Sequence, residues 1–279
     1  MVDTHVHLWT NDFERYPLSS DFRATDMLRP SYEPEDLLRD AVPSGVNRFV
    51  LVQMSYYGTD NSYMLDILRS DPSSFRGIAV VDPDAAHPDT AMRELLPQGV
   101  VGFRIYMESE HPQALSGHPG YEKMFRCAGE LRVAICPLID PHRLPDLAWQ
   151  CARFPETPVI IDHLARIGMT WPADDNDVRA LCTLAVFPEV RVKLSGFYAL
   201  GERRPPHTEL APLVRRVYEA FGARRLLWGS DVPFHLTRET YENGISLIRD
   251  RLDFLSTEDR EWILGRTARE LFFGVRAAA

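Results

Sequence analysis

Short apolar runs rich in β-branched residues recur along the whole chain, and segments of helical periodicity separate them. Eight such runs occur in 279 residues, roughly one every 35 residues. They are Val2–Trp9, Arg48–Met54, Arg76–Asp82, Val100–Tyr106, Arg132–Ile139, Pro158–Leu164, Arg191–Tyr198 and Arg225–Phe234. Nearly continuous apolar strands that alternate with helix-sized segments indicate βα units and parallel pairing.

The intervening segments carry helix signals. Pro34 opens one amphipathic stretch, Asp60-Asn61 precedes a second, and Pro88 starts a third that Pro97 ends. Apolar residues at helical spacing mark the others, which are Gly120–Arg132, Leu144–Phe154, Asn176–Phe187, Glu209–Phe221 and Trp262–Phe273. No linker or low-complexity tract divides the chain. We therefore predict one α/β domain over residues 1–279, a single (β/α)8 TIM barrel.

A doubly wound open sheet is the alternative architecture. It usually has a glycine-rich phosphate turn after its first strand, and the chain contains neither G-x-G-x-x-G nor a Walker A pattern. The barrel is therefore the favoured prediction.

The charge balance narrows the class of ligand. The chain has 31 Lys and Arg against 40 Asp and Glu, a net charge of −9. That balance disfavours nucleic acid as a partner, whereas a locally basic pocket still permits an anionic small substrate. No signal peptide and no apolar run of about 18 residues is visible, so we predict a cytoplasmic protein without a membrane partner. The four cysteines have no zinc-finger or C-x-x-C spacing and are predicted to be free thiols.

Titratable side chains stand at the carboxyl ends of three predicted strands, which is where barrel enzymes keep their chemistry. The first run contains His5 and His7, which lie two residues apart and share a face of the strand. They point into the barrel if Val2, Val6 and Leu8 face the helices. The sixth run ends at His163, and the eighth brings Asp231 to the rim. Four such groups buried together without a purpose would be costly, although packed core histidines are the alternative for the pair in the first strand.

These residues belong to longer motifs. Asp3-Thr4-His5-Val6-His7, Ile161-Asp162-His163-Leu164, Lys193-Leu194-Ser195-Gly196 and Gly229-Ser230-Asp231-Val232-Pro233 occur in that order from the first strand to the eighth. Together they resemble the signatures of the amidohydrolase superfamily, and best those of its lactonase branch, which opens pyrone dicarboxylates and sugar-acid lactones. The resemblance implies that His5, His7 and His163 surround a scissile carbonyl and that Asp231 is the general base for water.

The chain departs from the metal-rich members of that superfamily. Those members add a Lys or Glu at the fourth strand and a His at the fifth, where this chain has Arg104 and Cys136. A binuclear centre is therefore not expected, and Cys136 is a minor alternative ligand. The prediction is no required cofactor, or a single divalent metal such as zinc on His5, His7, His163 and Asp231. We expect burial to raise the pKa of Asp231 and so improve it as a base.

Polar side chains near other strand ends are candidates for substrate binding. Arg104 suits a carboxylate, with a structural salt bridge as its alternative role. Hydroxyl and amide groups that could orient an oxygen-rich ring come from Gln53, Tyr56, Tyr106, Ser195 and Tyr198. Lys193 is assigned no catalytic role and either points outward or pairs within the barrel. The remaining histidines are expected to be mostly exposed to solvent, with His235 of interest because it lies close to Asp231.

The resulting prediction is a hydrolase that opens a small lactone or related cyclic ester, with a carboxylated or polyol substrate. A metal-dependent nonoxidative decarboxylase of the same superfamily is one alternative, and a barrel that only binds a ligand is another. A homo-oligomer remains possible, because Phe272-Phe273 either covers the barrel or forms an interface.

Overall fold

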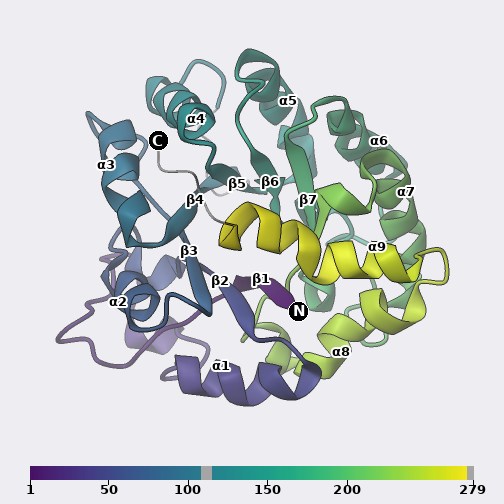
Figure 1. Ribbon diagram of the computed structural model, residues 1–279, viewed down its shortest axis with the longest axis horizontal. Coiled ribbons are helices and arrows are strands. Elements are labelled where there is room, and N and C mark those ends of the chain that lie inside the picture. The colour runs from purple at the N-terminus through teal and green to yellow at the C-terminus, as the bar shows by residue number, and fades with distance from the viewer. Residues whose placement is uncertain (108–114, 275–279) are drawn as a thin grey trace.

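The computed structural model describes residues 1–107 and 115–274. Eight parallel strands follow one another in chain order around a barrel, with helices on the outside (Figure 1). The strands are β1 (Val2–Val6), β2 (Arg48–Val52), β3 (Phe75–Ala79), β4 (Val100–Met107), β5 (Ala134–Ile139), β6 (Val159–Ile161), β7 (Val190–Leu194) and β8 (Leu226–Trp228). The prediction of a (β/α)8 barrel is confirmed, and the open sheet is not what the chain forms.

The barrel closes between β1 and the segment that follows β8. The backbone N–H of His7 donates to the carbonyl of Val232 at 2.9 Å, and the N–H of Asp231 donates to the carbonyl of His5 at 2.8 Å. The closing hydrogen bonds therefore place Asp231 beside the two histidines of the first strand.

The helices surround the strands as the sequence pattern indicated. They are α1 (Pro34–Ala41), α2 (Ser62–Ser70), α3 (Pro88–Leu95), α4 (Pro119–Leu131), α5 (Leu144–Arg153), α6 (Asp175–Thr183), α7 (Ala211–Phe221), α8 (Tyr241–Ser246) and α9 (Thr257–Glu261). Wider turns prolong α8 through Leu247–Arg251 and α9 through Trp262–Arg266 and Arg269–Phe273. Among the described residues, no helix is long and apolar enough to span a bilayer.

Apolar side chains form two layers, one inside the barrel and one between strands and helices. The alternation along β2 shows the division, since Val50 and Val52 lie in the inner layer and Phe49 and Leu51 in the outer one. The condition set for inward-pointing histidines holds for Val6 and Leu8, which lie in the outer layer, but not for Val2, which belongs to the inner layer. The pairing of β1 with β2 shifts register between Asp3 and Val6, and such an irregularity exchanges the two faces of a strand.

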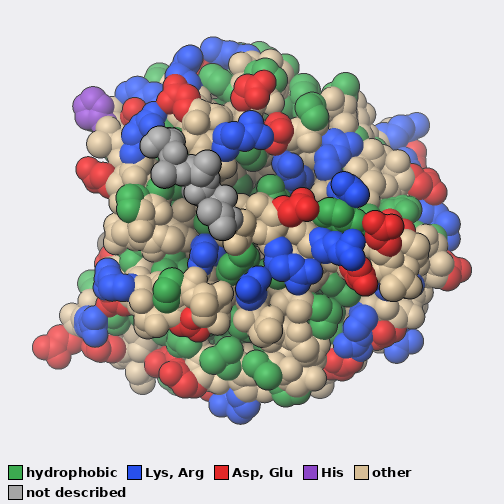
Figure 2. Space-filling view, in the orientation of Figure 1, with side chains coloured by type: hydrophobic (Ala, Val, Ile, Leu, Met, Phe, Trp, Pro, Cys, Tyr) green, Lys and Arg blue, Asp and Glu red, His purple; other side chains and the backbone are tan. Residues whose placement is uncertain are grey.

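The C-terminal helical segment covers the amino-terminal end of the barrel. Ala268 and Phe272 pack on the inner apolar layer, and Figure 1 views the molecule from this side, with the yellow segment lying across the strands. Lys and Arg side chains gather along it on the surface (Figure 2). Of the two roles considered for Phe272, the structure shows that it covers the barrel, so the site must open at the other end.

Six of the eight strands end earlier than their apolar runs predicted, and three of these lead directly into titratable residues at the carboxyl end of the barrel. β1 stops at Val6, β6 at Ile161 and β8 at Trp228. In each case the residues beyond the strand leave the sheet and bring polar side chains to the open mouth of the barrel. The apolar pattern continues past the strand because these short segments are still buried.

Candidate active site

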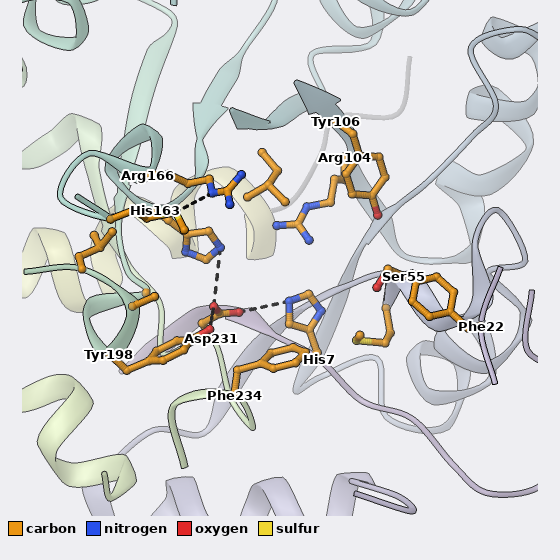
Figure 3. A pocket seen from close by; sticks show the side chains of 16 residues that line it. His7, Phe22, Ser55, Arg104, Tyr106, His163, Arg166, Tyr198, Asp231 and Phe234 are labelled. Atoms are coloured by element: carbon orange, nitrogen blue, oxygen red, sulfur yellow. Dashed lines mark hydrogen bonds and ion pairs between the residues drawn. The ribbon is translucent and has the colours of Figure 1, made fainter. Parts of the chain in front are cut away.

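One carboxylate and three imidazoles meet at the carboxyl end of the barrel. Oδ1 of Asp231 lies 3.3 Å from Nε2 of His7 and 3.6 Å from Nε2 of His5, and its Oδ2 lies 3.8 Å from Nε2 of His163. Figure 3 shows the carboxylate between the rings of His7 and His163. The structure thus brings together four residues that are up to 226 positions apart in the chain.

The arrangement of these atoms fits a divalent cation. Nδ1 of His7 lies 2.9 Å from the carbonyl oxygen of Val52, so the proton sits on Nδ1 and a lone pair remains on Nε2. That lone pair faces the carboxylate of Asp231, and two acceptors face each other favourably only with a proton or a cation between them. His5, His163 and Asp231 offer donor atoms that all lie within 4.8 Å of one another.

The spacing of the nearest donor atoms agrees with tetrahedral coordination. Nε2 of His5 and Nε2 of His7 are 3.2 Å apart, and both lie 3.3–3.6 Å from Oδ1 of Asp231. Ligand atoms about 2.0–2.1 Å from a tetrahedral zinc ion are separated by about 3.3–3.4 Å. Nε2 of His7 thus lies beside two members of the group of His5, His163 and Asp231.

His163 stands on a left-handed turn directly after β6. His163, Leu164, Ala165 and Arg166 all have positive φ values, between 50° and 59°. This region is disfavoured by roughly 1–2 kcal/mol for each residue that carries a Cβ atom, and such outliers cluster at functional sites. The turn directs the ring of His163 at Asp231, and Ser195 orients that ring, with its Oγ 2.9 Å from Nδ1.

A buried ion network lies beneath the histidines. Asp162, which is fully buried, is 3.0 Å from Nζ of Lys193 and 3.0 Å from a guanidinium nitrogen of Arg104. Burial alone would raise the pKa of Asp162, but the charges of Lys193 and Arg104 help to hold it well below its ordinary value. Nζ of Lys193 is also 3.3 Å from Nδ1 of His5. Of the two roles considered for Lys193, pairing within the barrel is the one observed.

The charge state of Asp231 differs from the sequence-based prediction. Burial alone would raise its pKa, as expected, but the surrounding histidines, His163 foremost, hold the pKa well below its ordinary value. Burial, and after it Lys193, lower the pKa of His5. Asp231 is therefore an ionised carboxylate, and the hydroxyl of Tyr198 donates to its Oδ2 at 2.8 Å.

A cavity of about 480 Å³ opens above this group, within the range of small-molecule sites. His7, His163 and Asp231 form part of its floor, and Arg104 and Arg166 lie at one side (Figure 3). The guanidinium of Arg166 lies 2.9 Å from Asp140. Tyr106, Tyr198 and Phe234 add aromatic walls.

Comparison with known proteins identifies the family. The family model described as amidohydrolase matches residues 2–274. The chain belongs to the amidohydrolase family. The resemblance inferred from the four motifs, and with it the prediction of a hydrolase, is confirmed.

Several relatives of this amidohydrolase hydrolyse lactones. The chain is 26% identical to a 4-sulfomuconolactone hydrolase of Hydrogenophaga intermedia over 99% of this chain and 90% of the relative. It is 27% identical to an L-fucono-1,5-lactonase of Burkholderia ambifaria over 83% of this chain and 80% of the relative. A crystal structure of a probable 2-pyrone-4,6-dicarboxylic acid hydrolase from Acinetobacter baumannii, with citric acid bound, matches with a TM-score of 0.82 at 26% identity, over 98% of this chain and 99% of that one.

Not all of the predicted binding residues reach the cavity of this amidohydrolase. Gln53 is buried beside β2, where its side-chain amide donates to the carbonyl of Asp60 at 2.6 Å. The hydroxyl of Tyr56 accepts the backbone N–H of Leu28 at 3.1 Å. A tight turn at Ser55–Tyr57 follows β2 after two residues, and both side chains bind to backbone groups of the surrounding loops instead of reaching the cavity. Arg104, Tyr106 and Tyr198 do line the cavity.

Sequence reasoning missed three residues that shape the site. Asp162 was noted only as part of a motif, Arg166 follows it by four positions, and Phe234 follows Asp231 by three. A signal existed for Asp162, because a carboxylate inside an apolar run needs a buried cation. Cys136, the minor alternative ligand, lies in the inner apolar layer, where burial raises the pKa of its thiol to about 12.

Most of the remaining histidines were expected to be exposed, but two of them are buried. His207 is fully buried with its Nε2 3.0 Å from a carboxylate oxygen of Glu239. His235 is fully buried as well, against the ring of Tyr241. The loops after β7 and β8 pack on each other there, a long-range contact that the local sequence does not indicate. Of the others, His87 and His142 are exposed, His118 is half-buried at the start of α4, and His111 lies outside the described residues.

His235 makes stability depend on pH. Neither of its ring nitrogens has a hydrogen-bond partner among the described residues, and burial lowers its pKa to about 4. The unfolded chain, with a histidine pKa of about 6.5, binds a proton first as the pH falls, so the free energy of unfolding drops between pH 6.5 and 4 by about 3 kcal/mol. We expect His235→Phe to lose this part of the pH dependence in denaturant titrations with chelator present, and the exposed control His87→Phe to retain it. An unchanged pH profile in His235→Phe would contradict the assignment.

Proposed function

We propose that this amidohydrolase hydrolyses a small lactone that carries carboxylate or hydroxyl substituents. The observation that carries the proposal is the ionised Asp231 held among His5, His7 and His163 at the floor of a ligand-sized cavity. The named relatives, which open sulfomuconolactone and fuconolactone, support it. Hydrolysis of a carboxylic ester is the reaction class common to those relatives.

Asp231, His7, His163 and Tyr198 have different roles in the proposed reaction. Asp231 accepts a proton from the water whose oxygen attacks the lactone carbonyl, and His163 and His7 border the space where negative charge develops on the carbonyl oxygen. The ring C–O bond then breaks, and the proton held by Asp231 passes to the departing ring oxygen. Tyr198 keeps the carboxylate oriented through the hydrogen bond that its hydroxyl donates. Burial and the charge of Asp231 raise the pKa of this hydroxyl, so it keeps its proton.

One divalent ion such as zinc fits this arrangement. His5, His7 and Asp231 would hold it together with His163, and when bound it would polarise the carbonyl and acidify the attacking water. The donor spacing described above supports this choice over imidazoles alone.

Arg104 and Arg166 are proposed to face the acidic or hydroxylated part of the substrate. Both guanidiniums lie beside the cavity and each is paired with a carboxylate, Arg104 with Asp162 and Arg166 with Asp140. Those carboxylates hold each planar group in place, which favours directional hydrogen bonds to a substrate oxygen.

A screen of purified protein tests the proposal. We expect hydrolysis of at least one sugar-acid or pyrone lactone, which a pH indicator detects through the acid that ring opening releases. Elemental analysis should find close to one divalent metal ion per chain. Chelation should lower the activity at least tenfold and zinc or manganese should restore it. Full activity in metal-free protein would overturn the metal assignment. Carbon dioxide release from aromatic acids, or tight binding without turnover, would instead favour the decarboxylase or the ligand-binding barrel.

A further inference from the structure

A second cavity adjoins the first at the mouth of the barrel. It has a volume of about 450 Å³ and lies above the carboxyl ends of β2, β3 and β4. Phe22, Ser55, Arg104 and Tyr106 line both cavities. In Figure 3 these four side chains lie on the side of the site away from Tyr198, and as shared lining they mark where the two cavities meet.

The first cavity is large enough for the reacting ring by itself. Small-molecule sites usually have volumes of about 300–1,000 Å³, and the cavity over Asp231 reaches about 480 Å³ without the second one. A monocyclic lactone placed with its carbonyl at Asp231 would leave the second cavity empty. The continuous lining therefore suits a substrate with two parts.

The lining of the second cavity differs in charge from that of the first. Among the described residues that line it, Arg104 is the only Lys or Arg, and Asp162 already pairs with it. Carboxylates come from Asp21 and Asp82, both on exposed loops. An anionic group would meet like charges there, whereas hydroxyl groups would find strong acceptors.

Hydroxyl and aromatic groups complete this lining. Ser19 and Thr59 supply hydroxyls that both donate and accept, and Tyr106 and Tyr121 supply rings. A sugar unit presents hydroxyls at its edge and C–H groups on its faces, so it matches a site that combines acceptors, hydroxyls and aromatic walls.

We propose that the second cavity is a subsite for a neutral, polyhydroxylated substituent on the lactone, of the size of one sugar unit. The preferred substrate would then be a glycosylated aldonolactone rather than a lactone of a single sugar acid. This inference rests on the proposed function, because it places the lactone ring in the first cavity.

Pairs of substrates test the subsite. Lactobionolactone and cellobionolactone carry a sugar unit on an aldonolactone, and gluconolactone is the matching lactone without it. We expect kcat/KM to be at least tenfold higher for the glycosylated lactones, mainly through a lower KM. Equal values, or a preference for an arm that ends in a carboxylate, would overturn the proposal.

Variants in the second cavity locate the effect. Thr59 is exposed and lines the second cavity but not the first, so Thr59→Trp fills the subsite without touching the proposed catalytic group. We expect a rise in KM of at least tenfold for the glycosylated lactones and a change below twofold for gluconolactone. Thr90→Trp, at an exposed position on α3, is the matched control and should change neither.

The carboxylates allow an isosteric test. We expect the double variant Asp21→Asn/Asp82→Asn to raise KM for the glycosylated lactones roughly tenfold, because hydrogen bonds to charged acceptors are lost. Oδ1 of Asp82 accepts the backbone N–H of Asp84 at 2.9 Å, and an asparagine oxygen can keep that bond. Unchanged KM values in both this variant and Thr59→Trp would overturn the proposal.

A binding measurement separates this inference from the proposed function. If no lactone is hydrolysed, the proposed function fails, and calorimetry with the acids lactobionate and gluconate still tests the subsite. Tighter binding of lactobionate that is lost in Thr59→Trp would support the second cavity as a sugar site. Equal binding of the two acids would overturn it.

Discussion

Replacement of Asp231 by Asn should reduce kcat for lactone hydrolysis by about a thousandfold or more, since loss of a general base typically costs 10²–10⁴. The amide keeps the shape of the side chain but cannot accept a proton from water. It also replaces an anionic donor in the proposed metal group. The backbone at this position has a φ of 64°, which asparagine tolerates well, so the variant should fold.

Two comparisons show whether that loss is chemical. Asp60→Asn alters an exposed carboxylate on the loop after β2, outside both cavities, and should leave kcat unchanged. Unfolding of Asp231→Asn should remain cooperative, with a near-wild-type circular dichroism spectrum. Retention of more than a tenth of the wild-type kcat by Asp231→Asn would remove Asp231 from the role of base.

The barrel and its four central residues could be predicted because both depend on local periodicity. Apolar runs at regular spacing indicate βα units, and residues two apart on a strand share a face, which places His5 beside His7. Parallel strands bring their carboxyl ends to one side of the barrel, so His163 and Asp231 follow. The register shift in β1 places Val2 on the inner face of the barrel, but His5 and His7 still lie side by side.

Backbone detail after the strands could not be predicted in the same way. The left-handed turn at His163–Arg166 contains no glycine or asparagine, so no residue in it signals positive φ. Gln53 and Tyr56, near the turn after β2, lie outside the cavity, whereas Tyr106 lines it. The sequence around these three residues does not show this difference. Contacts between loops, such as the one that buries His207 and His235, depend on partners more than 25 residues apart.

The buried ion network beneath the site could be predicted only in part. Arg104, Asp162 and Lys193 come from or directly follow β4, β6 and β7, and each stands between apolar neighbours or at the end of an apolar run in the sequence. Which of them pair depends on the stagger of the strands around the barrel. The sequence therefore indicates that buried charges need partners, and only the assembled barrel shows which partners they have.

Replacement of Lys193 by Met should lower the free energy of unfolding by about 3–5 kcal/mol, the usual cost of leaving one partner of a buried ion pair uncompensated. Lys193 and Asp162 are both fully buried and 3.0 Å apart, and methionine has a similar volume, so lost packing contributes little. Such a loss is a large part of a total that is typically 5–15 kcal/mol. Equilibrium denaturation in guanidinium chloride, with chelator present, measures it.

A second replacement distinguishes lost charge pairing from lost packing. In Lys193→Met/Asp162→Asn the buried carboxylate is also removed, so we expect the double variant to recover part of the stability that Lys193→Met loses. Lys123, on the surface of α4 with its ammonium group on the carbonyl of Ala86, provides the control, and Lys123→Met should stay within about 0.5 kcal/mol of the wild type. A double variant that is less stable than Lys193→Met would contradict this expectation. Lys193 would then stabilise the barrel through packing, and Arg104 alone would balance the charge of Asp162.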